Sequence, residues 1–257
     1  MFWRLIPLLT TTGKLQMAID KWLLHQHLQE KIPPTLRFYT WQPVTISLGY
    51  HQKSYPEYWQ NLTWQDTSVD IVRRPTGGRA VLHQGDLTYS LITSGLSRRP
   101  IESYQAICEF LIRGWRSLGL EVSYGSAGRG YIKNPNCFGT STTADLILPN
   151  GKKFIGSAQL RKKGAILQHG SMILAPDIDF FRYVFNSEVF PGVSDFSTSF
   201  LSTNNMGENL INQIIEALII AASEYFKIQL ITEPLSDQEW QEIHNFANTN
   251  KTEQPIL

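Results

Sequence analysis

Helix-like and strand-like segments are intermixed along this chain without a regular alternation of strand and helix. Residues 15–29, 101–118 and 208–226 have the i, i+3, i+4 apolar spacing of an amphipathic helix. Ser236 and Glu239 have the spacing of a capping box, which predicts the start of a fourth helix. Strand-like runs lie between these segments, at residues 36–41, 44–49, 68–73, 79–83, 87–93, 144–148, 152–158 and 165–174. The pattern predicts an α+β fold in which helices pack on a mixed, mostly antiparallel sheet.

The chain has 257 residues, a length that fits one large domain or two small ones. No internal repeat occurs, and no linker rich in proline or serine divides the chain. We therefore expect a single domain over residues 1–247, followed by a polar, frayed C-terminal tail over residues 248–257.

The charges of the chain are balanced, with 23 lysines and arginines against 22 aspartates and glutamates. This balance excludes a strongly basic protein that binds nucleic acid or membranes through its net charge. The longest apolar run, residues 217–222, is far shorter than the roughly 20 residues of a membrane span. Because the N-terminus also lacks the basic and apolar regions of a signal peptide, we expect a cytoplasmic protein.

An arginine-rich turn is the first candidate for chemistry, with the sequence Arg73-Arg-Pro-Thr-Gly-Gly-Arg79. Gly77 and Gly78 can adopt positive φ angles or let a ligand approach the backbone. Three arginines around one turn suit an anion such as a phosphate or a carboxylate, although a plain hairpin with a Gly-Gly turn is the simpler alternative. The segment has neither the Gly-Lys-Ser/Thr of a P-loop nor the glycine pattern of a dinucleotide-binding fingerprint.

A second candidate is the β-rich stretch of residues 152–159. Its small residues 156–158 leave room for a ligand to lie against the backbone. Lys152 and Lys153 point in opposite directions on a strand, so only one of them can face the covered side of the sheet. We interpret Lys152 as a surface charge, whereas a lysine that faces inward could act as a base.

The chain contains two cysteines, too few for a disulfide framework. Cys108 falls on the apolar face of the helix predicted for residues 101–118, where a thiol is expected to be buried and inert. Cys137 falls in a polar loop, where a thiolate would be accessible and reactive. From the residues alone, Cys137 could be either a nucleophile or a structural thiol. The histidines are scattered, and no metal-binding spacing of histidines or cysteines occurs.

Several motifs together resemble the superfamily of lipoate-protein ligases, octanoyltransferases and biotin-ligase catalytic domains. They are Met17-Ala-Ile-Asp20, Ser47-Leu-Gly-Tyr50, the segment from Arg73 to His83, Leu87-Thr-Tyr-Ser90, Lys153-Phe-Ile-Gly-Ser-Ala-Gln159 and Leu167-Gln-His-Gly-Ser171. Within the superfamily, the pair Cys137-Phe138 upstream of Lys153 is similar to the cysteine-dependent octanoyltransferases of the LipM type. The Gly-Arg-Gly-Arg loop typical of biotin ligases is not matched.

This resemblance implies a catalytic domain of the lipoate and biotin ligase type, with roles for particular residues. Cys137 would be the catalytic nucleophile and Lys153 its catalytic partner, which stabilises the thiolate as an ammonium and takes up a proton as a neutral amine. We expect both side chains to converge on one cleft beside the Gly-Gly turn. The residues implied to bind substrate are Arg73, Arg74, Gly77, Gly78, Arg79, His83, Gly156, Ser157, Ala158, Gln159, His169 and Gly170.

The implied reaction transfers an octanoyl group in lipoate biosynthesis. The donor would be an octanoyl thioester on acyl carrier protein, and the acceptor a lysine of a lipoyl carrier domain, either the glycine cleavage H protein or a 2-oxoacid dehydrogenase E2. Transfer from thioester to amide runs downhill, so the resemblance implies no ATP, metal or other cofactor.

Two alternatives to this reading follow from the same motifs. The nearer one is an ATP-dependent lipoate-protein ligase that makes an acyl-adenylate with Mg²⁺. In such an enzyme Lys153 and the arginine-rich turn would hold phosphate and carboxylate, and Cys137 would be incidental. A carrier-binding protein without catalytic activity is the more distant alternative.

Overall fold

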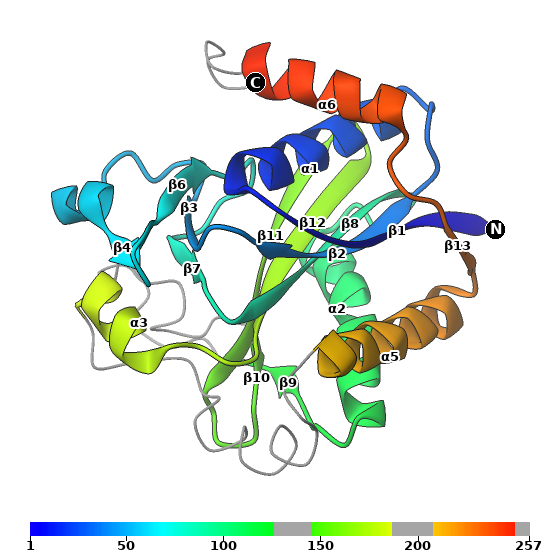
Figure 1. The fold of residues 1–257 in the computed structure, drawn as a ribbon. Coiled ribbons are helices and arrows are strands. Elements are labelled where there is room, and N and C mark those ends of the chain that lie inside the picture. Colours follow the sequence, from blue (N-terminus) through cyan, green and yellow to red (C-terminus); the bar gives the residue numbers. More distant parts are fainter. Residues whose placement is uncertain (126–144, 187–207, 250–257) are drawn as a thin grey trace.

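The computed structural model describes residues 1–125, 145–186 and 208–249. Its largest element is an eight-stranded sheet that runs through the middle of the molecule (Figure 1). In sheet order the strands are β13 (Gln229–Thr232), β1 (Phe2–Thr11), β2 (Thr35–Trp41), β8 (Asp86–Ser94), β12 (Ala165–Ile173), β11 (Lys153–Lys162), β10 (Leu146–Ile147) and β9 (Ser123–Tyr124). β1 pairs in parallel with β13 and β2, and the other strand pairs of this sheet are antiparallel. The prediction of a mixed, mostly antiparallel sheet is confirmed.

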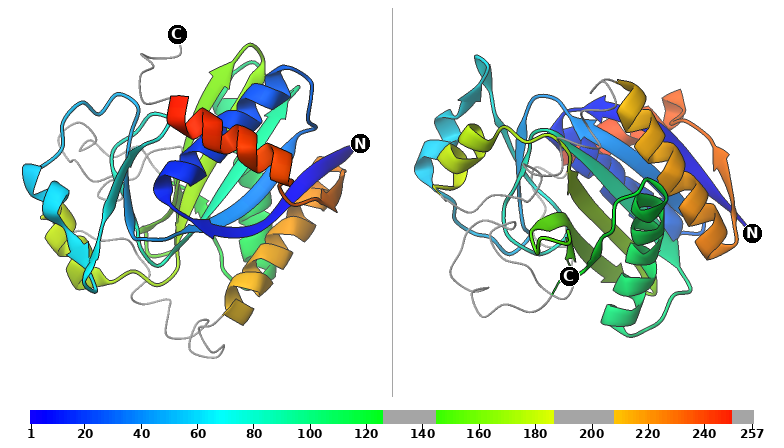
Figure 2. Two further views of the ribbon diagram at one scale, coloured as in Figure 1. Left: turned by 45° about the horizontal axis from the view of Figure 1, so that its top comes forward. Right: turned by 90° about the horizontal axis from the view of Figure 1, so that it is seen from below.

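Helices cover both faces of this sheet, as Figures 1 and 2 show. On one face lie α1 (Gly13–Leu28) and α6 (Asp237–Thr249), and on the other lie α2 (Pro100–Ser117) and α5 (Glu208–Phe226). Ile19 and Leu23 of α1 belong to one apolar cluster with Leu167 of the sheet, and a larger apolar cluster includes residues of α2 and α5. The helices predicted from the apolar spacing are present, and the α+β class is confirmed.

The start of α6 shows how the sequence specifies a helix end locally. The backbone N–H of Ser236 donates to Oε2 of Glu239 at 2.8 Å, and the backbone N–H of Glu239 donates to Oγ of Ser236 at 3.3 Å. Each side chain thereby satisfies a backbone N–H at the helix start, where no carbonyl of the helix is available. The predicted capping box is confirmed. The helix continues to Thr249 and so includes residues 248 and 249 of the predicted tail.

A smaller sheet lies beside the large one and carries the arginine-rich turn. Its central strand β3 (Thr45–Leu48) pairs in parallel with β6 (Asp70–Arg73) and antiparallel with β7 (Val81–His83). The turn between β6 and β7 contacts the face of the large sheet that α1 covers, because Oγ1 of Thr76 lies 2.6 Å from Nε2 of His169 on β12.

The strands β1 and β13 and the helix α3 (Ile178–Phe185) are not among the predicted segments. Residues 3–6 of β1 are buried consecutively between two parallel neighbours, so its position in the sheet rather than an alternating pattern accounts for this strand. The remaining short elements are η1 (Glu57–Asn61), β4 (Thr63–Trp64) and β5 (Thr67–Ser68). Among the residues that the structure describes, no helix combines the length and the apolar character needed to cross a membrane.

Candidate functional site

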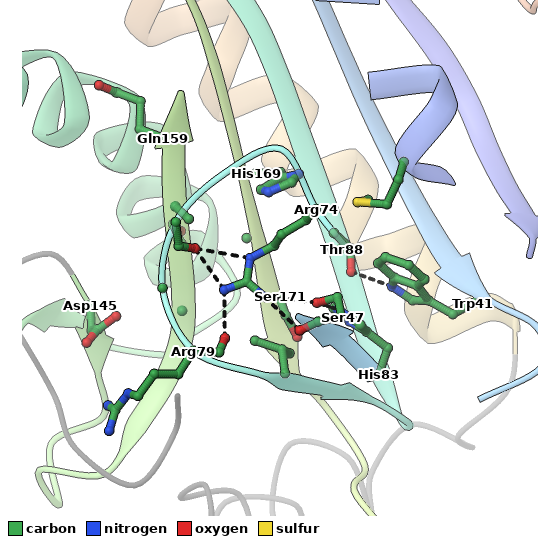
Figure 3. A pocket seen from close by; sticks show the side chains of 18 of the residues that line it. Trp41, Ser47, Arg74, Arg79, His83, Thr88, Asp145, Gln159, His169 and Ser171 are labelled. Carbon is green, nitrogen blue, oxygen red and sulfur yellow. Dashed lines mark hydrogen bonds between the residues drawn. The ribbon is translucent and has the colours of Figure 1, made fainter. Parts of the chain in front are cut away.

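A pocket of about 260 Å³ lies between the large sheet and the turn that joins β6 to β7 (Figure 3). Ala158 pairs with His169 and His169 pairs with Ser90 on adjacent antiparallel strands, so these three side chains share the face of the sheet that α1 covers. The pocket is close in size to the smallest small-molecule sites, about 300 Å³. Its lining residues are Met17, Tyr39, Trp41, Ser47, Arg74, Gly77, Gly78, Arg79, Val81, His83, Thr88, Asp145, Lys153, Gly156, Ser157, Ala158, Gln159, His169, Gly170 and Ser171.

The arginine-rich turn is folded around the guanidinium group of Arg74, as Figure 3 shows. Nη1 donates to the backbone carbonyl of Ser47 at 2.7 Å, and Nη2 donates to the carbonyls of Gly77 at 2.8 Å and Arg79 at 2.6 Å. Gly78 has a φ of +93°, a region that favours glycine, and a Cβ there would lie 2.8 Å from Nη2 of Arg74. Arg74 therefore holds the backbone of the turn in the shape that forms one wall of the pocket.

A buried ion pair supports the wall formed by the large sheet. Oδ1 of Asp20, on α1, lies 2.9 Å from Nε of Arg37, on β2, and both side chains are fully buried. Oδ2 of Asp20 also accepts from Nδ1 of His169 at 2.8 Å and from the Tyr39 hydroxyl at 3.2 Å. Burial alone would raise the pKa of Asp20. The charges and hydrogen bonds of Arg37 and His169 lower this pKa by more, so the net shift is downward. Asp20 thereby orients the imidazole of His169, whose Nε2 meets Thr76 of the turn.

His83 has a similar arrangement at a neighbouring wall. Its Nδ1 lies 2.8 Å from Oδ2 of Asp86, its Nε2 lies 2.8 Å from Oγ of Ser47, and its ring stacks on Trp41 with the centroids 3.8 Å apart. Because a carboxylate only accepts hydrogen bonds, Nδ1 carries the proton and Nε2 accepts from the Ser47 hydroxyl. Burial lowers the pKa of His83 despite the nearby Asp86 carboxylate, which favours the neutral imidazole.

Lys153 and Asp145 form a second buried ion pair, at the pocket wall. Nζ of Lys153 lies 2.7 Å from Oδ1 of Asp145, and the two side chains are 3% and 6% exposed. Lys153 is the first residue of β11 and pairs with Ile147 of β10, while Asp145 directly precedes β10. Lys152 is half-buried, so the alternation along the strand makes Lys153 the inward-facing lysine.

Gly170 of β12 occupies a place where a side chain would not fit. A Cβ at this position would overlap Oγ of Ser157 and would lie 2.6 Å from Cε1 of Tyr89. The Tyr89 hydroxyl donates to Oγ of Ser157 at 2.8 Å across the gap that glycine leaves. The close approach of these three neighbouring strands at the pocket therefore requires glycine.

The structure brings almost all of the predicted substrate-binding residues together, since every one except Arg73 lines the pocket. Arg73 instead donates through Nη1 to the carbonyls of three residues in the segment 49–52, which follows β3. Lys153 lines the same pocket as the Gly-Gly turn. Cys137 lies outside the described residues.

Cys108 lies on the buried side of α2, in the larger apolar cluster. Burial raises the pKa of its thiol to about 12, so the thiol stays protonated at neutral pH in the folded protein. The prediction that this cysteine is buried is confirmed.

A second group of residues forms or supports the site and is not among the residues predicted from the sequence. The lining residues in this group are Met17, Tyr39, Trp41, Ser47, Val81, Thr88, Asp145 and Ser171, and those behind the lining are Asp20, Arg37, Thr76 and Asp86. Seven members of this group fall within the motifs that carried the resemblance, which was the available signal: Met17, Asp20, Ser47, Thr76, Val81, Thr88 and Ser171. Asp145 has no such signal, because its role depends on the pairing of β10 with β11.

The family model of the lipoyl protein ligase A/B catalytic domain matches residues 12–218 of the chain. The chain belongs to this family. Two solved structures have the same fold: lipoate-protein ligase A bound with ATP, and a bipartite lipoate protein ligase from Thermoplasma acidophilum. The first has a TM-score of 0.75 and 24% identity, covering 99% of this chain and 98% of that one. The second has a TM-score of 0.71 and 23% identity, covering 98% and 95%.

Curated relatives narrow the activity within the family. Octanoyltransferase LipM of Brevibacillus brevis is 35% identical over 258 residues, which cover 92% of this chain and 91% of the relative. Octanoyltransferase LipM of Bacillus subtilis is 35% identical over 269 residues, which cover 96% and 94%. These relatives confirm the predicted enzyme class, an octanoyltransferase that acts in lipoate biosynthesis.

Proposed function

We propose that this octanoyltransferase takes its octanoyl group from the thioester on acyl carrier protein and transfers it through an acyl-enzyme at Cys137. The final acceptor is the ε-amine of a lysine on a lipoyl carrier domain, such as the glycine cleavage H protein or a 2-oxoacid dehydrogenase E2. Lys153 is the catalytic partner of the cysteine. The observation that carries the proposal is the buried ammonium of Lys153 in the wall of a small pocket.

The shape and lining of the pocket support an alkyl substrate. Met17, Trp41 and Val81 supply apolar surface, and Gly156 and Ala158 leave space along β11. A small pocket with this apolar surface suits an unbranched acyl chain, which has only its carbonyl end to hydrogen-bond.

In the first half of the reaction, the Cys137 thiolate attacks the thioester carbonyl and the bond between that carbon and the carrier sulfur breaks. The carrier thiolate then takes a proton from the Lys153 ammonium. In the second half, neutral Lys153 takes a proton from the acceptor ammonium, and the free amine attacks the acyl-cysteine. Cys137 leaves as a thiolate, and the second proton of the amine passes to solvent.

The contacts of Arg74 favour this reaction over an acyl-adenylate ligase. A ligase of the alternative kind would use the arginine-rich turn to hold phosphate groups. Arg74 here donates to the carbonyls of Ser47, Gly77 and Arg79, and these bonds commit its guanidinium to the backbone of the turn.

We also propose that the pocket-lining residues of the predicted set contact the acyl chain and its carbonyl. Residues 1–247 are proposed to form a single catalytic domain that α6 extends to Thr249, followed by a tail whose residues 250–257 lie outside the described part of the chain.

The proposal is tested by mixing the enzyme with octanoyl-acyl carrier protein and a lipoyl domain without ATP. The mass of the lipoyl domain reports transfer. We expect transfer by the wild-type enzyme and by Cys108→Ala, a matched control for the other cysteine, and loss of transfer in Cys137→Ser. Transfer by Cys137→Ser at the wild-type rate, or transfer that depends on ATP and free octanoate, would contradict the proposal.

A further inference from the structure

The backbone around Asp145 is held in place by its neighbours on either side in the sheet. Its own carbonyl accepts from the backbone N–H of Gly125 at 2.8 Å, and the next residue, Leu146, pairs with Ile155 of β11. The side chain of Asp145 is therefore fixed at the start of a strand, where it extends to Nζ of Lys153 at 2.7 Å. Figure 3 shows Asp145 at one side of the pocket.

A lysine side chain has four methylene groups and is flexible, so its ammonium does not hold one position by itself. Proton transfer to and from a reacting group requires the two heavy atoms to lie within about 2.6–3.2 Å of each other. Lys153 begins its strand, and its side chain is buried with a carboxylate at hydrogen-bond distance. The ion pair with Asp145 therefore restricts the position of Nζ.

The negative charge of Asp145 also affects the pKa of neighbouring groups. Burial raises the pKa of the Cys108 thiol, and the negative charge of Asp145 raises it further. Burial also raises the pKa of Tyr104, and Asp145 contributes to that rise after Cys108 and Tyr89. A carboxylate that disfavours other anions in this region is matched by the ammonium of Lys153, which is buried with it.

We infer that Asp145 is a positioning residue of the acyl transfer, which holds the Lys153 ammonium in the place from which it exchanges protons with the reacting groups. This inference rests on the proposed role of Lys153. Asp145 does not itself touch the substrate carbonyl, and it affects the rate only because it positions Lys153.

The test compares Asp145→Asn, Asp145→Glu, Lys153→Ala and the double variant Asp145→Asn/Lys153→Ala in the ATP-free transfer assay. We expect Asp145→Asn to lower kcat about 10- to 100-fold, because a misplaced ammonium loses its geometry, while KM for the donor stays within about twofold. Asp145→Glu keeps the carboxylate and should be faster than Asp145→Asn. In the Lys153→Ala background, Asp145→Asn should change kcat by less than about twofold, since two residues that act together are not additive.

A kcat of Asp145→Asn within about twofold of wild type would overturn the inference, and so would effects that multiply in the double variant. If Asp145→Asn does not fold, as judged by its thermal melt, Asp145→Glu decides: a kcat equal to that of wild type contradicts the inference, and a kcat between wild type and Lys153→Ala supports it. Full activity of Lys153→Ala would instead show that the proposed role of Lys153 is wrong. Asp70→Asn, a half-buried aspartate outside the pocket lining, is the matched control and should retain activity.

Discussion

The buried pair of Asp20 and Arg37 offers the sharpest test of how the pocket is supported, and Asp20→Asn is the perturbation. The substitution keeps the size of the side chain and removes its negative charge. Arg37, which is fully buried, then lacks a carboxylate partner, and His169 loses the carboxylate that accepts from its Nδ1.

Removing one partner of a buried ion pair typically costs about 3–5 kcal/mol of unfolding free energy, because the remaining charge is left buried without compensation. For a chain of this size, each kcal/mol lowers the melting temperature by about 2–4 °C. We therefore expect Asp20→Asn to melt about 6–20 °C below wild type at pH 7. Thermal unfolding followed by circular dichroism measures this difference.

The effect of Asp20→Asn on the melting temperature should change with pH in one direction. The pKa of Asp20 is lowered in the folded state from its ordinary value of 3.8, so the carboxylate stabilises the fold fully above that value. This contribution is lost as the pH falls below 3.8 toward the folded-state pKa. The difference in melting temperature between wild type and Asp20→Asn should therefore shrink below about pH 4.

Asp179→Asn is the matched control, since the Asp179 side chain is 95% exposed and lies 3.6 Å from Arg182. We expect its melting temperature to stay within about 2 °C of wild type. If the melting temperature of Asp20→Asn also stayed within about 2 °C of wild type, the idea that a buried charge pair supports the pocket would be refuted.

Three further predictions follow from local features of the fold. Gly170→Ala should lower the unfolding free energy by about 1–3 kcal/mol, because its Cβ overlaps Ser157. Gly77→Ala is the control and should melt like wild type, since no atom lies within 4 Å of the added Cβ. Equal melting temperatures of the two variants would contradict this prediction. The Cys108 thiol, whose pKa burial raises to about 12, should react with iodoacetamide at pH 8 only after unfolding, as peptide mass mapping can show, and labelling in the native protein would disprove its burial. Ser236→Ala should cost about 1 kcal/mol in urea unfolding by removing the cap of α6, and an unchanged midpoint would show that the cap contributes nothing.

The parts of the fold that could be predicted from sequence are those with a local signal. Apolar spacing predicted α1, α2 and α5, and the Ser236–Glu239 spacing predicted the start of α6. β1 was missed because a strand buried between two parallel neighbours shows no alternating pattern, and α3 because a helix of eight residues gives too short a period to recognise.

The site shows the same division between local and distant information. The motifs located the Gly-Gly turn, Lys153 and His169, which do line one pocket. The partners of these residues come from elements far away in the chain: Asp20 lies 149 residues from His169, so only the folded sheet and α1 bring them together. Arg74 illustrates a second limit, because its sequence context suggested anion binding while its position in the turn commits it to backbone carbonyls.

The most direct test of the central claim is the intact mass of the enzyme after mixing with octanoyl-acyl carrier protein in the absence of ATP. We expect a gain of one octanoyl group that hydroxylamine removes and that Cys137→Ser abolishes, as expected for a thioester. An enzyme that gains no mass under these conditions, yet modifies a lipoyl domain once ATP and free octanoate are added, would contradict the claim and identify a ligase.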